Sequence, residues 1–76
     1  MNADRRKKIK EASEGLDAAR AVLEEARDEE QDYIDDMPEN LQGGDRANRA
    51  EEVVDILDTA ISELETTVEQ LEEATQ

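Results

Sequence analysis

Two stretches of apolar residues, each repeating at alternating steps of three and four, most constrain what this chain can fold into. The first stretch runs from about residue 4 to residue 37, and the second from about residue 45 to residue 75. Steps of three and four keep apolar side chains on one stripe of an α-helix, as in helices that pack along a heptad seam. The sequence therefore predicts a single all-α domain with two long helices.

A short segment rich in helix-breaking residues separates the two stretches, at about residues 38–44. Pro38 disfavours helical backbone at the residue before it, and Gly43 and Gly44 supply conformational freedom. Asp45 is a reasonable N-cap for the second helix. We expect the chain to reverse direction in this segment.

The two seams match when the second helix runs antiparallel to the first. Each predicted facing pair then sums to 80, from Ile9 with Leu71 to Tyr33 with Ala47, which places the tip at residue 40 inside the turn. Small alanine side chains in the first seam would allow a close approach of the helices. The first predicted seam comprises Ile9, Ala12, Leu16, Ala19, Leu23, Ala26, Glu30 and Tyr33, and the second comprises Ala47, Ala50, Val54, Leu57, Ile61, Leu64, Val68 and Leu71.

Further apolar residues beside the seams indicate that another helix surface covers the hairpin. The chain has 76 residues, no Cys and no His, so neither disulfides nor the usual zinc sites can stabilise a domain of this size. We expect a homodimer that forms a four-helix bundle, or else a hairpin that binds a partner protein. The predicted strip for the dimer or partner consists of Val22, Ile34, Val53, Ile56 and Ala60.

Charge is unevenly distributed along the chain. Residues 11–76 hold 22 Asp and Glu against four Arg, whereas residues 1–10 hold five basic residues and one Asp. The acidic surface has two interpretations: it only solvates the outer helix faces, or it imitates the phosphates of a nucleic acid and binds a protein with a basic surface. The residues predicted to form that binding surface are Glu25, Asp28, Glu29, Asp32, Asp35, Asp36, Glu51, Asp55, Asp58, Glu65, Glu69 and Glu72.

The basic residues cluster between Arg5 and Lys10, near the expected end of the second helix. We expect Glu69, Glu72 and Glu73 to neutralise this cluster, so that it binds neither nucleic acid nor a membrane. No apolar run follows the cluster, and no stretch is long enough to span a membrane. These patterns predict a cytoplasmic protein.

Catalytic and metal-binding patterns are missing from the sequence. Glu30 is the only acid on a predicted seam, and we expect it to form an ion pair with Arg49 rather than to bind a metal. Di-metal helical bundles normally add His to inward-facing Glu, and this chain has no His to activate a Ser or Thr nucleophile. We predict a non-enzymatic protein without a cofactor.

Two residues near the turn have alternative interpretations. Tyr33 lies on the predicted seam, where packing is expected, although Tyr is also enriched at protein-binding hot spots. Leu41 in the turn either covers the end of the helix interface or offers an exposed contact.

The segments 29–33, 36–42 and 50–61, with the turn sequence Met-Pro-Glu-Asn-Leu-Gln, resemble small acidic helical-hairpin proteins encoded by phages and mobile elements. The resemblance implies a phage-type inhibitor that occupies the nucleic-acid-binding surface of a host enzyme or defence protein. The alternative is a structural or adaptor hairpin that acts through apolar helix-helix contacts. Salt sensitivity separates the two hypotheses, because added salt screens exposed charges.

Overall fold

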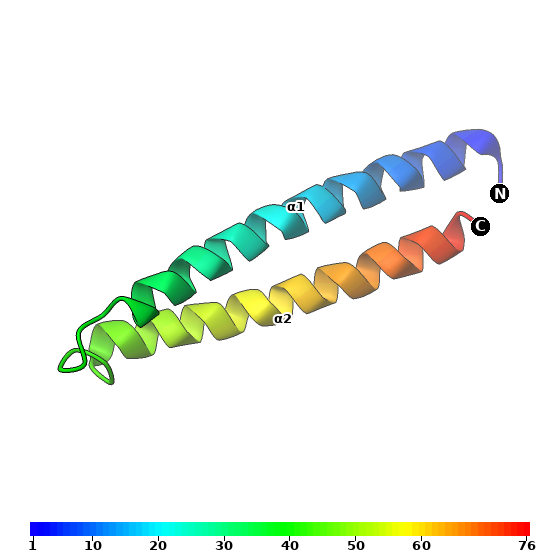
Figure 1. The fold of residues 1–76 in the computed structure, drawn as a ribbon. Coiled ribbons are helices and arrows are strands. Elements are labelled where there is room, and N and C mark those ends of the chain that lie inside the picture. Colours follow the sequence, from blue (N-terminus) through cyan, green and yellow to red (C-terminus); the bar gives the residue numbers. More distant parts are fainter.

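The computed structural model describes all 76 residues as two antiparallel helices joined by a turn. Helix α1 spans Ala3–Asp35 and helix α2 spans Asp45–Ala74. The helices lie side by side, with both termini at one end of a rod that measures 60 × 14 × 13 Å (Figure 1). This architecture confirms the predicted all-α helical hairpin. Neither helix contains an apolar stretch long enough to cross a lipid bilayer.

Local sequence signals explain where the helices begin and end. Asn2 caps α1, because its Oδ1 accepts a hydrogen bond of 2.8 Å from the backbone N–H of Arg5. Pro38 disfavours helical backbone at Met37, and α1 ends at Asp35, close to the predicted boundary. The predicted cap of α2 is wrong by one residue: Gly44 is the N-cap, and Asp45 is the first helical residue.

The turn is held by its own hydrogen bonds. The N–H groups of Leu41 and Gln42 donate to the Pro38 carbonyl at 2.9 and 3.3 Å. Asn48 donates from its side chain to the carbonyl of Gly43 at 3.3 Å. Gly43 has a φ of +87°, a left-handed conformation that residues with a side chain rarely adopt. The chain therefore reverses nearer to Gly43 than to the predicted tip at residue 40.

Helix α2 packs against α1 with the face that its periodicity predicts. One column of this face, at steps of seven, is buried at all four positions, and the second column is buried or half-buried. The residues of the two columns are Ala47, Val54, Ile61 and Val68, and Ala50, Leu57, Leu64 and Leu71. This half of the predicted interface is confirmed.

The face of α1 that packs against α2 differs from the predicted seam in one of its two columns. Ile9, Leu16, Leu23 and Glu30 are half-buried, as that seam requires. The second predicted column, Ala12, Ala19, Ala26 and Tyr33, is exposed, and the next column replaces it. In that replacing column, Ser13 and Ile34 are buried, and Arg20 and Arg27 are half-buried.

The physical reason for the difference is the small size of alanine. Three alanine side chains have little apolar surface to bury, so burying them would stabilise the predicted orientation of α1 only weakly. Turning α1 by one column buries Ile34, which is 8% exposed, in a cluster with Ala50 and Val54. The same rotation brings Arg27 to Asp58 of α2.

The facing register also differs from the predicted one. The facing pair Arg27 and Asp58 sums to 85, and Lys10 lines a common hollow with Thr75, a pair with the same sum. The predicted sum was 80. The offset arises because residues 38–42 form an additional turn before the chain reverses at Gly43.

Candidate interaction surfaces

The two open sides of the hairpin have opposite chemistry, and one side is polar. Arg27 crosses this side and joins the helices, with its Nη1 3.0 Å from Oδ1 of Asp58. Arg20 precedes Arg27 by seven residues and lies in a hollow that is also lined by Glu65, Glu69 and Glu72 of α2. We call this side the polar flank.

Both arginines of the polar flank are held in their charged form. The pKa of Arg27 is raised by hydrogen bonds from its guanidinium to Asp58 and then to Asp28. The pKa of Arg20 is raised by hydrogen bonds to Asp17 and then to Glu24, which lie on the same helix. The sequence alone did not single out these arginines, although their spacing of seven residues places them in one column.

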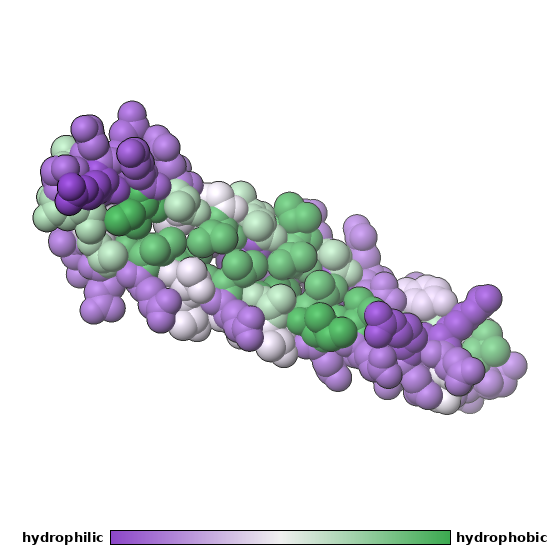
Figure 2. Space-filling view, turned by 180° about the vertical axis from the view of Figure 1, so that it is seen from behind, coloured by the Kyte–Doolittle hydropathy of each residue, from purple (hydrophilic) through white to green (hydrophobic).

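The opposite side of the hairpin is apolar and open to solvent. Figure 2 shows hydrophobic residues gathered in a band along most of one face, bordered by hydrophilic residues. Spacings of three, four and seven keep the members of each helix on one stripe. We define the apolar band as the exposed residues Ala12, Ala19, Val22, Ala26 and Tyr33 of α1 and the half-buried residues Val53, Leu57, Ala60, Leu64 and Leu71 of α2.

The predicted apolar strip agrees only in part with this band. Val22 is 62% exposed, and Val53 and Ala60 are half-buried, so these three residues are available for contact. Ile34 is not available, because it is buried between the helices. Ile56 is 58% exposed at the rim, where it lines a shallow hollow with Ala60 and three polar residues.

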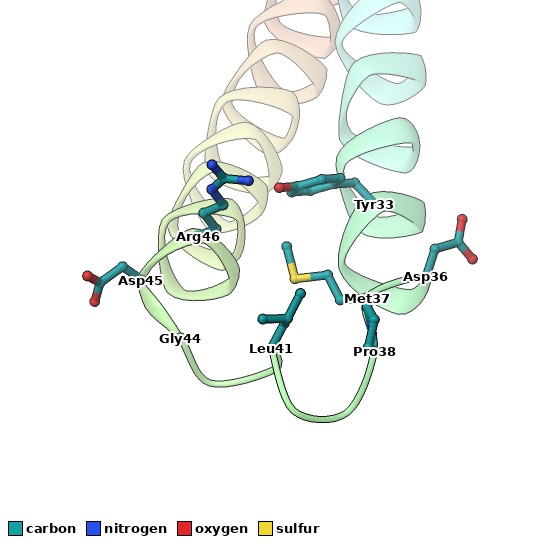
Figure 3. Close-up of a pocket in the computed structure, with 8 residues that line it drawn as sticks. All are labelled: Tyr33, Asp36, Met37, Pro38, Leu41, Gly44, Asp45 and Arg46. Carbon is teal, nitrogen blue, oxygen red and sulfur yellow. The ribbon is translucent and has the colours of Figure 1, made fainter.

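A hollow of about 510 Å³ lies at the tip of the hairpin, where the apolar band ends. Tyr33 projects from α1 toward α2, with its hydroxyl directed at the Arg46 guanidinium, and Met37 and Leu41 point into the space below (Figure 3). Tyr33 is 47% exposed and Leu41 is 55% exposed. The packing role predicted for Tyr33 on the seam is therefore wrong, and both residues are open to contact.

All acidic residues except Glu24 and Glu30 are exposed on the surface of the hairpin. All twelve residues of the predicted acidic binding surface are exposed. Five of the 23 carboxylates in the chain take part in ion pairs, which leaves 18 without one. Among the predicted twelve, only Asp28 and Asp58 are paired, both with Arg27.

The basic cluster lies at the opposite end of the rod from the tip. Lys10 shares a hollow with Glu72 and Thr75, so the residues before Lys10 lie at or beyond the last turn of α2. None of the five basic residues forms an ion pair, and the predicted pairing with Glu69, Glu72 and Glu73 is absent. The shift in facing register explains the error, because it moves the cluster past those acids.

Glu30 is half-buried between the helices and has no ion pair. The partner predicted for it, Arg49, instead pairs with Glu52 of its own helix at 3.1 Å. The structure contains no group of three acidic side chains that could hold a metal ion.

The fold and its surfaces define a two-helix hairpin with one apolar side and acidic outer faces. Comparison with protein families, curated proteins and solved structures finds no match to this chain. No relative therefore indicates a function, and a proposal has to start from the surfaces of the hairpin.

Proposed function

We propose that this chain is a non-enzymatic protein-binding module whose acidic outer faces bind a basic surface of another protein. The observation that carries the proposal is the set of 18 carboxylates without an ion pair on a rod 60 Å long. Like charges repel one another, so such a surface destabilises a small hairpin. A basic partner surface would relieve that repulsion.

The charge density of the rod is comparable with that of a nucleic acid strand. A net charge of −14 along 60 Å corresponds to about one negative charge per 4 Å. A single strand of DNA carries about one per 3.4 Å, and the duplex about one per 1.7 Å. A basic groove that binds a nucleic acid backbone is therefore a suitable class of partner, and the hairpin would inhibit that partner by occupying the groove.

The resemblance of the turn and its flanks to acidic phage proteins is a second support for this proposal. It directs attention to nucleic-acid-handling and defence proteins of a bacterial host as partners. The hairpin itself would not contact nucleic acid, because its acidic faces repel phosphates.

A pulldown from host extract with a charge-neutralised variant tests the proposal. Asp32 and Asp36 lie four residues apart on one exposed face near the tip. In about 0.1 M salt, the wild-type protein should capture basic, nucleic-acid-handling proteins. Asp32→Asn/Asp36→Asn should capture several-fold less, because two charges of the binding face are lost.

The matched control neutralises the same number of charges in the other half of the rod. Glu11→Gln/Glu14→Gln changes two exposed acids that lie near the basic cluster and outside the twelve residues of the predicted acidic binding surface, and should reduce capture less than Asp32→Asn/Asp36→Asn does. Raising the salt to about 0.5 M should release the partner, since the Debye length falls to a few ångströms. Capture that survives this salt in both variants would contradict the proposal.

The apolar band favours a second candidate function, that of an adaptor that adds its helices to the helical bundle of a partner. Such contacts bury apolar surface and are not screened by salt. Val22→Glu would place a charge in the band and abolish adaptor binding at about 0.5 M salt. Asp32→Asn/Asp36→Asn would leave adaptor binding intact, which is the reverse of the pattern expected for the acidic faces.

A further inference from the structure

The hairpin leaves more surface exposed than a folded monomer of its mass normally does. It exposes 5681 Å² at 8.5 kDa, whereas the scaling for folded monomers gives about 4,650 Å². The excess of about 1,000 Å² is close to the roughly 800 Å² that each partner buries in a standard protein interface. The elongated hairpin therefore has enough excess surface to form one interface of standard size, and the apolar band is the part of that surface most favoured to be buried.

We propose that a second copy of this chain covers the apolar band, with the two hairpins face to face and their tips at opposite ends. A twofold axis perpendicular to the rods then places α1 against α1 of the partner and α2 against α2 of the partner. The resulting dimer is a four-helix bundle in which every neighbouring pair of helices is antiparallel.

The exposed stripe of α1 is self-complementary in this arrangement. When two copies of α1 run in opposite directions about a midpoint next to Val22, Ala19 of one copy lies opposite Ala26 of the other. These small residues allow a close approach of the two helices. Lys8 and Asp36 lie in the same column as Val22, at multiples of seven residues from it. In the dimer, Lys8 of each copy lies near Asp36 of the other copy, so opposite charges meet.

The distribution of charge selects this orientation over the one with both tips together. The tip half of the rod, residues 23–62, has 14 acidic and three basic residues, a net charge of −11. The remaining half has nine acidic and six basic residues, a net charge of −3. With tips at opposite ends, each half of net charge −11 faces a half of net charge −3. With tips together, the two −11 halves would face each other and the two −3 halves would face each other, which gives the stronger total repulsion. The basic cluster, which has no ion pair in its own chain, lies beside the partner's acidic tip.

The dimer also concentrates the acidic outer faces. Two overlapping chains carry a net charge of −28 along about 60 Å, or about one negative charge per 2 Å, which approaches the value of about 1.7 Å for duplex DNA. The dimer therefore leaves the acidic residues outside while it buries the apolar band.

The mass of the protein in solution, measured by light scattering at about 0.15 M salt, tests the dimer. We expect twice the chain mass of 8.5 kDa for the wild type, and a monomer for Val22→Glu. Thr66→Glu is the matched control, because it adds the same charge at an exposed position outside the band and should leave the dimer intact. A monomeric wild type would overturn the proposal.

Disulfide cross-linking tests the orientation and does not depend on whether the monomer folds. The chain has no Cys, so single cysteines can be introduced without interference. Val22→Cys lies next to its own copy across the twofold axis and should form a covalent dimer under mild oxidation. Asn40→Cys at the tip should not, because the two tips lie at opposite ends of the dimer. Cross-linking of Asn40→Cys in preference to Val22→Cys would overturn the proposed orientation.

Discussion

Arg27 and Asp58 form the single ion pair that joins the two helices, with 3.0 Å between Nη1 and Oδ1. Each of the other four ion pairs joins two residues of the same helix, three in α1 and one in α2. Arg27 can reach Asp58 only because α1 turns its Ser13, Arg20, Arg27 and Ile34 column toward α2. This contact therefore marks both the rotation of α1 and the facing register of the hairpin.

Exchanging the two charges of this ion pair tests the register. Arg27→Glu alone and Asp58→Arg alone should each lower Tm by roughly 2 to 5 °C, because each places like charges side by side. The double variant should recover most of the loss, since it restores an opposite pair. Thermal unfolding followed by circular dichroism measures the cycle. Losses that simply add in the double variant would show that the residues are not neighbours.

The same substitution at two isoleucines, Ile34 of α1 and Ile56 of α2, tests whether Ile34 is buried between the helices. Ile34→Ala should lower the free energy of unfolding by about 2 to 5 kcal/mol, because it opens a cavity beside Ala50 and Val54. Ile56→Ala, at a side chain that is 58% exposed, should cost less than about 1 kcal/mol. Urea unfolding gives both values. Equal costs would contradict the burial of Ile34.

Adding one methyl group at two glycines should have opposite effects. Gly15 lies inside α1, and a Cβ built there meets no atom within 4 Å, so Gly15→Ala should raise stability by about 0.5 to 1 kcal/mol. Gly43 has a φ of +87°, and Gly43→Ala should lower stability by about 1 to 2 kcal/mol. In urea unfolding, the free energy of unfolding should be higher than that of the wild type for Gly15→Ala and lower for Gly43→Ala. A stabilising Gly43→Ala would refute the left-handed turn.

Added salt should stabilise the fold, because the folded rod holds its carboxylates closer together than the unfolded chain does. Salt screens this repulsion more in the folded state, so Tm should rise when the salt concentration is raised from about 0.02 M to about 0.5 M. The raised pKa values of Arg20 and Arg27 mean that the stability contributed by these two groups is present at neutral pH and is lost only in strong alkali. A Tm that falls with added salt, measured by circular dichroism, would argue against charge repulsion as the dominant effect.

The sequence by itself determined the two helices, the turn and the buried face of α2. Periodic apolar residues, Pro38 and the glycine pair act locally, and large side chains such as Ile61 and Val68 bury enough surface to specify one orientation of α2. The sequence also placed the acidic residues on the outside, because charged side chains remain in water.

Only the tertiary structure decided which column of α1 faces α2. The column of Ala12, Ala19 and Ala26 and the column of Ser13, Arg20 and Arg27 repeat with the same spacing of seven residues, and neither buries much apolar area. With so weak a local preference, the choice depends on contacts across the hairpin: Ile34 against Ala50 and Val54, and Arg27 with Asp58. Those contacts turn the alanine column outward, and they thereby create the apolar band on the surface of the hairpin.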